Sequence, residues 1–329
     1  MNQVMFSVGE VKKMIEEGRK LILAGDEALL RSLPEGHWIG GTIPYFMAEK
    51  GGVLSNDKIY VTEIPGYIKK MVFKTYQEGS ISSIYTDAPE RGFTVVIIPA
   101  SSATHLSFAL KAPTYDGFAT SPLIGWISGV HVDNIGKVKP LVFFGEKGKV
   151  MDDEAVAIHA SLPEEKYADI DIINIFSQGD GDVITFPNDG FSATDALING
   201  KKTNFAEYVE ANGLDTRLPL VADYSGAMIN ISFQSVDAAA KSVNFYAPVF
   251  KDVEYRHAAP VSDYIREFTG MLPGAGTDTI FFSCNCILNY LYSELEGKKT
   301  GSVTGPITFG EVAYQLLNQT MVYLTIGDL

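Results

Sequence analysis

Residues 280–329 place a strand, a helix and a second strand in close succession, and this order constrains the fold more than any other stretch of the chain. The run Phe281-Phe282-Ser283-Cys284 predicts a buried strand that delivers small polar groups to a turn. A helix is expected next, and the chain then returns through Thr308-Phe309-Gly310-Glu311-Val312 and Asn318-Gln319-Thr320. A strand, a helix that covers it and a return strand that starts at a Gly-Glu corner usually build one wall of a pocket.

The N-terminal end of the chain repeats this order. Residues 21–24 are apolar and predict a buried strand, residues 27–33 predict a helix, and residues 38–41 predict the next strand. The following segments, 54–64 and 316–326, can also be aligned with one another. We therefore expect an internal duplication, with one of two related lobes at each end of the chain and a cleft between them.

Between these ends the chain is rich in strand patterns. Phe93-Thr94-Val95-Val96-Ile97-Ile98 has the composition of a fully buried strand, and tight turns such as Gly179-Asp180-Gly181-Asp182 join neighbouring strands. Most strand pairing should therefore be antiparallel. The patterns predict an α+β fold of antiparallel sheets flanked by helices. We expect two domains, residues 1–190 and residues 191–329, one for each lobe.

The charge balance limits the kinds of partner. The chain has 26 basic and 40 acidic residues, a formal net charge of -14, and the acidic residues are scattered along it. Such a surface repels phosphate backbones and anionic lipids, which argues against nucleic acid and membrane partners. Residues 1–7 lack a basic region followed by an apolar run, and no apolar stretch approaches the roughly 18 residues of a membrane span, so we expect a cytoplasmic protein.

Several short motifs resemble those of FIST sensory domains. The order Ser283-Cys284, Phe309-Gly310-Glu311 and Asn318-Gln319-Thr320 is similar to the C-terminal half of that family. Further similarity is carried by Phe205-Ala206-Glu207-Tyr208 after Asn199-Gly200, by Val243-Asn244-Phe245-Tyr246-Ala247-Pro248 and by the turn Trp38-Ile39-Gly40-Gly41-Thr42. The chain departs from the family at Asn285-Cys286-Ile287-Leu288-Asn289, because FIST proteins commonly carry an arginine shortly after the cysteine.

The resemblance implies a stand-alone, non-catalytic sensor that binds a small metabolite such as an amino acid. In signalling relatives the domain is attached to kinase, cyclase, chemoreceptor or F-box modules, so here we expect the output to pass through a separate signalling protein. Some FIST proteins are associated with haem, which His105, His131, His159 or His257 could ligate. An enzyme with a serine or thiol nucleophile is the alternative from another functional class.

Ser101 and Ser102 follow the apolar strand at the expected start of a helix. Their hydroxyls and the amides of the first helical turn could bind an anionic or carbonyl group, or Ser101 could serve only as the N-cap. His105 lies four residues after Ser101 on the same helical face. It could point back over the turn or could be a structural histidine.

Cys284 and Cys286, the only cysteines, allow three interpretations. They are too close for an easy disulfide, which fits a reducing compartment. A zinc site needs about four ligands, and a lone Cys-x-Cys supplies two, so we expect no metal. A thiol nucleophile would need a low pKa and a nearby base. The third interpretation is a pair of small residues in the core.

The remaining candidates are charged and aromatic. Glu311 could bind a ligand amine or could pair at a strand corner, and Arg256 could bind a carboxylate or pair with Glu254. The aromatic candidates lie beside Gly or Pro, at turns that a pocket could recruit. We expect the ligand in a gap enclosed by Thr42, Ser101, Cys284 and Glu311. The full set of expected ligand-binding residues is Thr42, Tyr45, Ser101, Ser102, His105, Trp126, Tyr246, Arg256, Cys284, Asn285 and Glu311.

Overall fold

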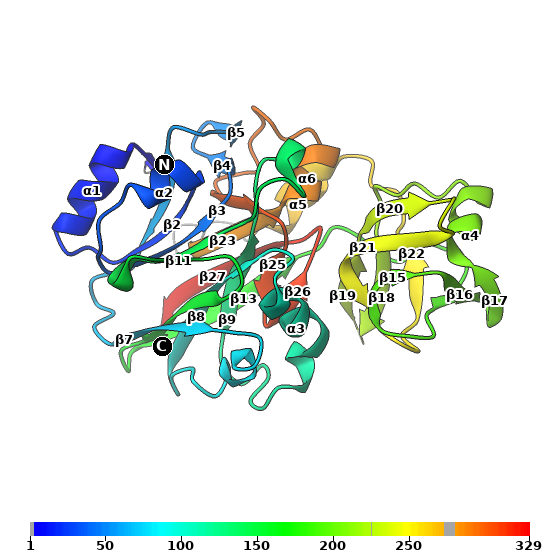
Figure 1. The fold of residues 1–329 in the computed structure, drawn as a ribbon, viewed down its shortest axis with the longest axis horizontal. Coiled ribbons are helices and arrows are strands. Elements are labelled where there is room, and N and C mark those ends of the chain that lie inside the picture. Colours follow the sequence, from blue (N-terminus) through cyan, green and yellow to red (C-terminus); the bar gives the residue numbers. More distant parts are fainter. Residues whose placement is uncertain (1–2, 225, 273–279) are drawn as a thin grey trace. The chain divides into compact units, whose positions relative to one another are not determined.

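The computed structural model describes residues 3–224, 226–272 and 280–329 (Figure 1). It confirms an α+β fold with mainly antiparallel sheets. The chain divides into two compact units. Unit 1 comprises residues 1–173, 271–316 and 321–329, and unit 2 comprises residues 174–270 and 317–320.

The described part of unit 1 contains three six-stranded sheets. Sheet 1 has the order β1 (Met5–Phe6), β6 (Ile59–Glu63), β2 (Leu21–Gly25), β3 (Trp38–Thr42), β10 (Val142–Phe144) and β11 (Lys149–Met151). Sheet 2 has the order β7 (Met71–Tyr76), β12 (Ala155–Ser161), β8 (Gly92–Pro99), β9 (Leu123–Ser128), β25 (Glu311–Ala313) and β26 (Gln315–Leu317). Sheet 3 has the order β13 (Lys166–Ile173), β27 (Met321–Asp328), β23 (Ile280–Cys286), β24 (Gly305–Thr308), β4 (Tyr45–Ala48) and β5 (Gly51–Leu54).

All three sheets are built in the same way. In each, one strand (β2, β8 or β23) is parallel to the strand that follows its helix and antiparallel to a later strand (β6, β12 or β27). An earlier strand pairs antiparallel at the outer edge. The helices are α2 (Glu27–Arg31), α3 (Ala103–Lys111) and α6 (Ile287–Tyr292). The two chain ends therefore share one topology, and a third copy lies between them that the sequence patterns did not reveal.

We call these units of topology copy 1 (residues 5–63), copy 2 (residues 71–161) and copy 3 (residues 166–173 with 280–328). Each copy gives its hairpin to the sheet of another copy. The hairpin β4–β5 joins β24, β10–β11 joins β3, and β25–β26 joins β9. Every copy donates one hairpin and accepts another, so the exchange is cyclic. It brings together the chain segments that directly follow β3, β9 and β24. Thr42 accepts from the Gly129 amide, for example, and the Phe309 amide donates to Ile127.

Local sequence explains the helix starts and the core of sheet 1. Helix α1 (Val8–Glu16) begins at a capping box, in which Ser7 and Glu10 each satisfy the other's backbone amide. The buried face of α1, including Val11 and Ile15, packs with apolar side chains of sheet 1 such as Leu23. The described part of unit 1 also contains four short 3₁₀ helices: η1 (Ile81–Ser83), η2 (Ala112–Thr114), η3 (Val132–Asn134) and η4 (Gly145–Lys147).

Unit 2 is a small β-rich body with an aromatic core. Its six-stranded sheet has the order β17 (Lys201–Asn204), β16 (Asp195–Ile198), β14 (Ile184–Thr185), β22 (Tyr255–His257), β18 (Leu220–Tyr224) and β19 (Ala227–Ile231). A second sheet contains β15 (Gly190–Ala193), β21 (Ser242–Val249) and β20 (Phe233–Asp237). The helices are α4 (Phe205–Ala211) and α5 (Tyr264–Met271). The rings of Phe186, Phe205 and Phe245 contact one another and fix the core.

The division into units differs from the expected domains 1–190 and 191–329. Unit 2 is inserted into copy 3 between β13 and β23, so the chain leaves unit 1 after residue 173 and returns to it. The C-terminal strand β27 pairs along its length with β13. That pairing joins residues far apart in the sequence, and a local pattern does not encode it.

Candidate functional site

Three of the expected ligand-binding residues lie in the packed interior of unit 1. Glu311 and Trp126 are fully buried and are cross-strand partners in β25 and β9. Cys284 of β23 is also buried, and its thiol donates to the Gly125 carbonyl oxygen at 3.3 Å. The Thr308 hydroxyl lies 3.4 Å from Glu311 Oε1. These strands lie together, and the polar groups of the three residues contact one another or the sheet backbone.

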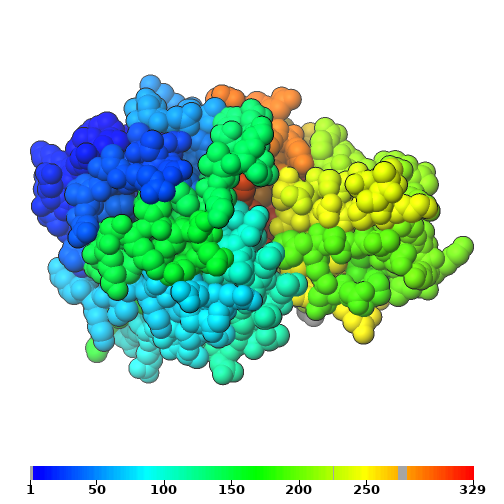
Figure 2. Space-filling view, in the orientation of Figure 1, coloured from blue at the N-terminus to red at the C-terminus, as the bar shows by residue number. Residues whose placement is uncertain are grey.

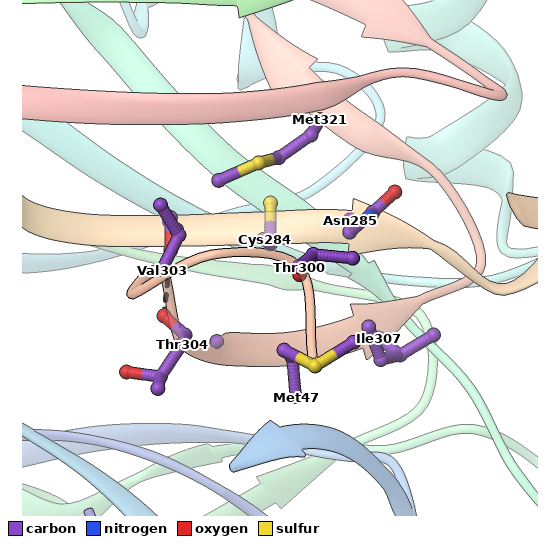
Figure 3. Close-up of a pocket in the computed structure, with 10 residues that line it drawn as sticks. Met47, Cys284, Asn285, Thr300, Val303, Thr304, Ile307 and Met321 are labelled. Atoms are coloured by element: carbon purple, nitrogen blue, oxygen red, sulfur yellow. Dashed lines mark hydrogen bonds between the residues drawn. The ribbon is translucent and has the colours of Figure 1, made fainter. Parts of the chain in front are cut away.

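The environment of Cys284 suppresses thiolate formation. Burial, with the nearby Glu311 carboxylate, raises the pKa of this thiol well above its ordinary value. Cys284 lines a cavity of about 10 Å³, which is about the minimum for one water molecule. In Figure 3 the thiol points toward Met321, another residue that lines this cavity. A buried, protonated thiol is a poor nucleophile.

Asn285 stands beside the cysteine, in the region where the FIST resemblance expects an arginine. Its Oδ1 accepts from the Cys286 amide at 2.8 Å and from Asn289 Nδ2 at 2.9 Å. The side chain therefore holds the turn from β23 into α6. Its polar atoms stabilise the fold at this point.

The serines after β8 hold the start of α3. Ser102, not Ser101, is the N-cap: its Oγ accepts from the His105 amide at 2.9 Å. Ser101 has a φ of 61°, and its amide donates to His105 Nδ1 at 3.1 Å. Burial lowers the pKa of His105 to about 4, so the ring is neutral near pH 7. His105 thus points back over the turn, where its partner is the backbone of Ser101, and it is a buried structural histidine.

Two expected residues lie in unit 2. Arg256 of β22 donates to the Gly181 carbonyl oxygen, and the Tyr246 amide of β21 donates to the Ser232 carbonyl oxygen. The other expected residues all lie in unit 1. Within either unit, the complete set is therefore not assembled.

A pocket of about 470 Å³ opens on the surface of unit 1. Its lining comes from residues 26–31, which are the N-cap and the whole of α2, from residues 42–44 at the end of β3, from Asn56, and from residues 129–139 in the connection between β9 and β10. Figure 2 shows the chain near residue 130 (green) standing on the surface beside N-terminal residues (blue). Of the expected ligand-binding residues, Thr42 lines this pocket, and Tyr45 follows directly after the lining segment 42–44.

Buried residues form the floor of the pocket. Ile43, Pro44 and Val130 line it and are buried, so they supply an apolar surface. The hydroxyl of Thr42 is engaged with Leu141, since it accepts from that amide at 2.9 Å. The floor can therefore receive an apolar group while Thr42 maintains the backbone around it.

Charged side chains of both signs surround this floor. Glu27 and Arg31 line the pocket and form an ion pair at 2.6 Å. Lys139, on the segment 129–139, also lines the pocket and forms an ion pair with Asp152 at 2.6 Å. These pairs are solvent-exposed, so each contributes little to stability and can be exchanged for contacts with a ligand. Asp26 adds a further carboxylate, which accepts from the Ala28 amide.

Aromatic rings form a row at one side of the pocket. His131 lines the pocket and stacks on Tyr45, with ring centroids 5.6 Å apart and an interplanar angle of 29°. Tyr45 in turn contacts Tyr290 of α6 at 5.6 Å. The Tyr45 hydroxyl accepts from the Val132 amide at 3.2 Å, and burial raises the pKa of this phenol. The row thus anchors the segment 129–139 to the neighbouring sheet.

At the corresponding junctions of the other two copies, aromatic rings of the chain pack against the accepting copy. In copy 2, Phe309 covers Gly129 so closely that a Cβ atom on this glycine would lie 2.4 Å from the ring. In copy 3, Tyr45 packs against Tyr290 of α6. The hairpin that copy 2 accepts is reached through two residues, 309–310, and the hairpin that copy 3 accepts through two residues, 43–44. The hairpin that copy 1 accepts follows a longer connection, residues 129–141 between β9 and β10. The longer connection is what leaves a pocket in copy 1.

Sequence reasoning did not place His131 or Lys139 at a ligand pocket, and it named His131 only as a possible haem ligand. His131 and Lys139 lie in the segment 129–139, which joins the sheet of copy 1 only through the exchanged hairpin. Its length was the available signal, because a connection much longer than a tight turn is often functional. Asp26 caps α2, and its place at a pocket depends on tertiary structure.

A buried hydrogen-bond chain in copy 2 was also missed. His159 Nδ1 lies 2.8 Å from Thr94 Oγ1, and its Nε2 lies 2.6 Å from the Tyr76 hydroxyl, which donates to Asp87 at 2.9 Å. Burial lowers the pKa of His159 to about 4. Because both ring nitrogens have partners, His159 is poorly placed to ligate haem. His257 of unit 2 likewise has its Nε2 3.0 Å from the Asp215 carbonyl oxygen.

The described residues contain neither a metal-binding cluster nor a membrane-spanning helix. Within residues 3–224, 226–272 and 280–329, no group of three or more His, Cys, Asp or Glu side chains is arranged to hold a metal ion. Among those same residues, no helix has the length and apolar character to cross a bilayer. No curated protein matches the sequence. The chain belongs to DUF6976, a family of unknown function, whose model matches residues 6–327.

Proposed function

We propose that this protein is a small-molecule sensor that binds a polar metabolite, such as an amino acid, in the pocket between α2 and residues 129–139. The observation that carries the proposal is the position of this pocket: it lies where copy 1 accepts its hairpin, whereas aromatic rings pack at the corresponding junctions of copies 2 and 3. Its volume of about 470 Å³ suits a small ligand. Its rim offers both charge signs, which fits a zwitterion.

The rival proposal is an enzyme that uses Cys284 or Ser101 as a nucleophile. The Cys284 thiol is buried and its pKa is raised, which opposes attack on a substrate. His105 Nδ1 accepts from the amide of Ser101, so this nitrogen is not positioned as a base for the serine hydroxyl. These contacts favour binding over catalysis.

A role like that of FIST domains is part of the same proposal. It is supported by the motif order along the chain, and it includes a cytoplasmic location and an output through a separate signalling protein. Cys284 and Cys286 are both buried and form no disulfide, which is compatible with a reducing compartment. A FIST structure with a strand order unlike that of the three sheets would contradict the kinship.

Ligand retention and a pocket-filling variant test the binding proposal. Native mass spectrometry of freshly purified protein, followed by release of any retained molecule, should reveal a metabolite or an empty protein that amino acids stabilise. A ligand at about 100 times its Kd should raise the free energy of unfolding by about 2.7 kcal/mol.

The variant Ala28→Trp places a large side chain in the pocket from an exposed helical position, so it should abolish binding and leave the fold intact. The matched control is Ala239→Trp, at an exposed position in unit 2. Binding that survives Ala28→Trp, or the absence of binding to any polar metabolite tested, would contradict the proposal.

A further inference from the structure

The buried lining of the pocket is shaped by neighbouring rings. Gly129, which lines the floor, is covered by Phe309 on the side of copy 2, and the backbone there approaches the ring closely because the glycine has no Cβ. Ile43, Pro44 and Val130 extend this apolar surface. An apolar group on this floor would thus lie on aliphatic carbon and glycine backbone. One face of a flat ring can pack on such a surface.

His131 supplies one wall for such a group. Its side chain is 32% exposed, and it stacks on Tyr45 and so belongs to the row that ends at Tyr290. A ligand ring that packs against the exposed part of His131 would extend the row by one member. Aromatic pairs of this kind contribute about 0.5–1.5 kcal/mol beyond the area that they bury.

The rim adds a charge requirement. Asp26 and Glu27 lie on the α2 side of the pocket together with Arg31, which pairs with Glu27, and Lys139 lies on the segment 129–139. An ammonium group suits the two carboxylates, and a carboxylate group suits the lysine. A ring and both charges on one small molecule describe an aromatic amino acid.

We infer that the ligand is an aromatic amino acid, whose ring lies on the floor against His131 and whose ammonium and carboxylate groups contact the rim. The inference rests on the proposed function and narrows it to one ligand class. It agrees with the corresponding junctions of the other copies, where the rings of Phe309 and Tyr45 pack.

Titration calorimetry with a matched ligand series tests this choice. Phenylalanine, tyrosine and tryptophan should bind about two- to tenfold more tightly than leucine and alanine, because only the former extend the ring row. Phenylpropionate lacks the ammonium group and phenethylamine lacks the carboxylate, so each should bind at least about tenfold more weakly than phenylalanine. Comparable affinities for leucine and phenylalanine would overturn the inference and leave the proposed function standing.

Variants of His131 separate stacking from general loss of the pocket. His131→Ala should weaken phenylalanine binding about fivefold and change leucine binding less than about twofold, whereas His131→Phe should restore the aromatic preference. The control is His37→Ala, which removes an exposed histidine elsewhere in unit 1. If His131→Ala weakens both ligands equally, His131 does not contact the ring and the inference fails. A ligand that still binds to Ala28→Trp overturns the proposed function itself.

Discussion

Small polar side chains at strand ends are used mainly to satisfy backbone groups. Thr42 bonds the Leu141 amide, Ser102 bonds the His105 amide, and Asn285 bonds the Cys286 amide. The sequence identifies such positions because a polar residue after an apolar run marks the end of a buried strand. It does not identify the partner, so a residue that closes a turn and one that faces a ligand look alike.

Two buried histidines should make stability depend on pH. Burial lowers the pKa of His105 and of His159 from 6.5 to about 4. As the pH falls below 6.5, the unfolded chain binds protons that the native protein excludes until about pH 4, so the free energy of unfolding decreases through this window. We expect each histidine to account for a loss of about 2–3 kcal/mol by pH 4.

Urea denaturation at a series of pH values measures this effect. Since carboxylates dominate at lower pH, the range from 6.5 to 5 is the most informative. Replacing both histidines with glutamine should flatten the curve in that range. An unchanged slope in the double variant would show that other groups cause the loss.

The cysteines should be chemically inert in the native protein. Cys284 and Cys286 are each 1% exposed, and the Cys284 thiol has a raised pKa. We expect iodoacetamide at pH 8 to modify neither residue in native buffer and both in denaturant, as read by mass spectrometry. Rapid labelling of the native protein would instead support the thiol-enzyme alternative.

Strand pairing within a copy depends on close backbone approach. In the parallel pair β8–β9, a Cβ atom on Gly125 would lie 1.8 Å from the Val96 carbonyl oxygen. This contact cannot be relieved by a side-chain rotation, because the neighbouring atom belongs to the backbone. The same glycine offers its carbonyl to Cys284, so the position joins copies 2 and 3.

Gly125→Ala should therefore destabilise unit 1 by about 3 kcal/mol or more, since either β8 or β9 must move. Gly66→Ala is the matched control: nothing lies within 4 Å of a Cβ atom there, and we expect a change within about 0.5 kcal/mol. Chemical denaturation of both variants gives the comparison. Equal stability of the two proteins would mean that the β8–β9 pairing is looser than described.

Unit 2 interrupts copy 3, yet four residues of the returning C-terminal chain belong to it. Asn318 Oδ1 accepts from the Ser232 amide at 3.0 Å, and Asn230 Nδ2 donates to the Asn318 carbonyl oxygen at 3.2 Å. These buried polar groups tie residues 317–320 to β19 and to the residue that follows it. The Asn-x-Thr motif of the sequence thus serves to hold unit 2 together.

Asn318→Ala should lower the stability of unit 2 by about 1–3 kcal/mol, because the Ser232 amide is left buried without this acceptor. Hydrogen exchange should increase in β19, β20 and β21 and remain unchanged in β8 and β9. Asn56→Ala, at an exposed position, serves as the control. Faster exchange spread evenly over both units would show that they unfold as one body.

The sequence by itself determined the elements and their class: apolar runs, caps and turn residues specify strands and helix starts, since these depend on neighbours in the chain. It also showed that the two ends share one order of elements. Only the tertiary structure decided the third copy, the cyclic exchange of hairpins and the pocket, because these depend on pairings such as β10 with β3 and β27 with β13. Hence Thr42 and Tyr45 could be named in advance, whereas His131 and Lys139 reach them only when a hairpin from copy 2 completes the sheet of copy 1.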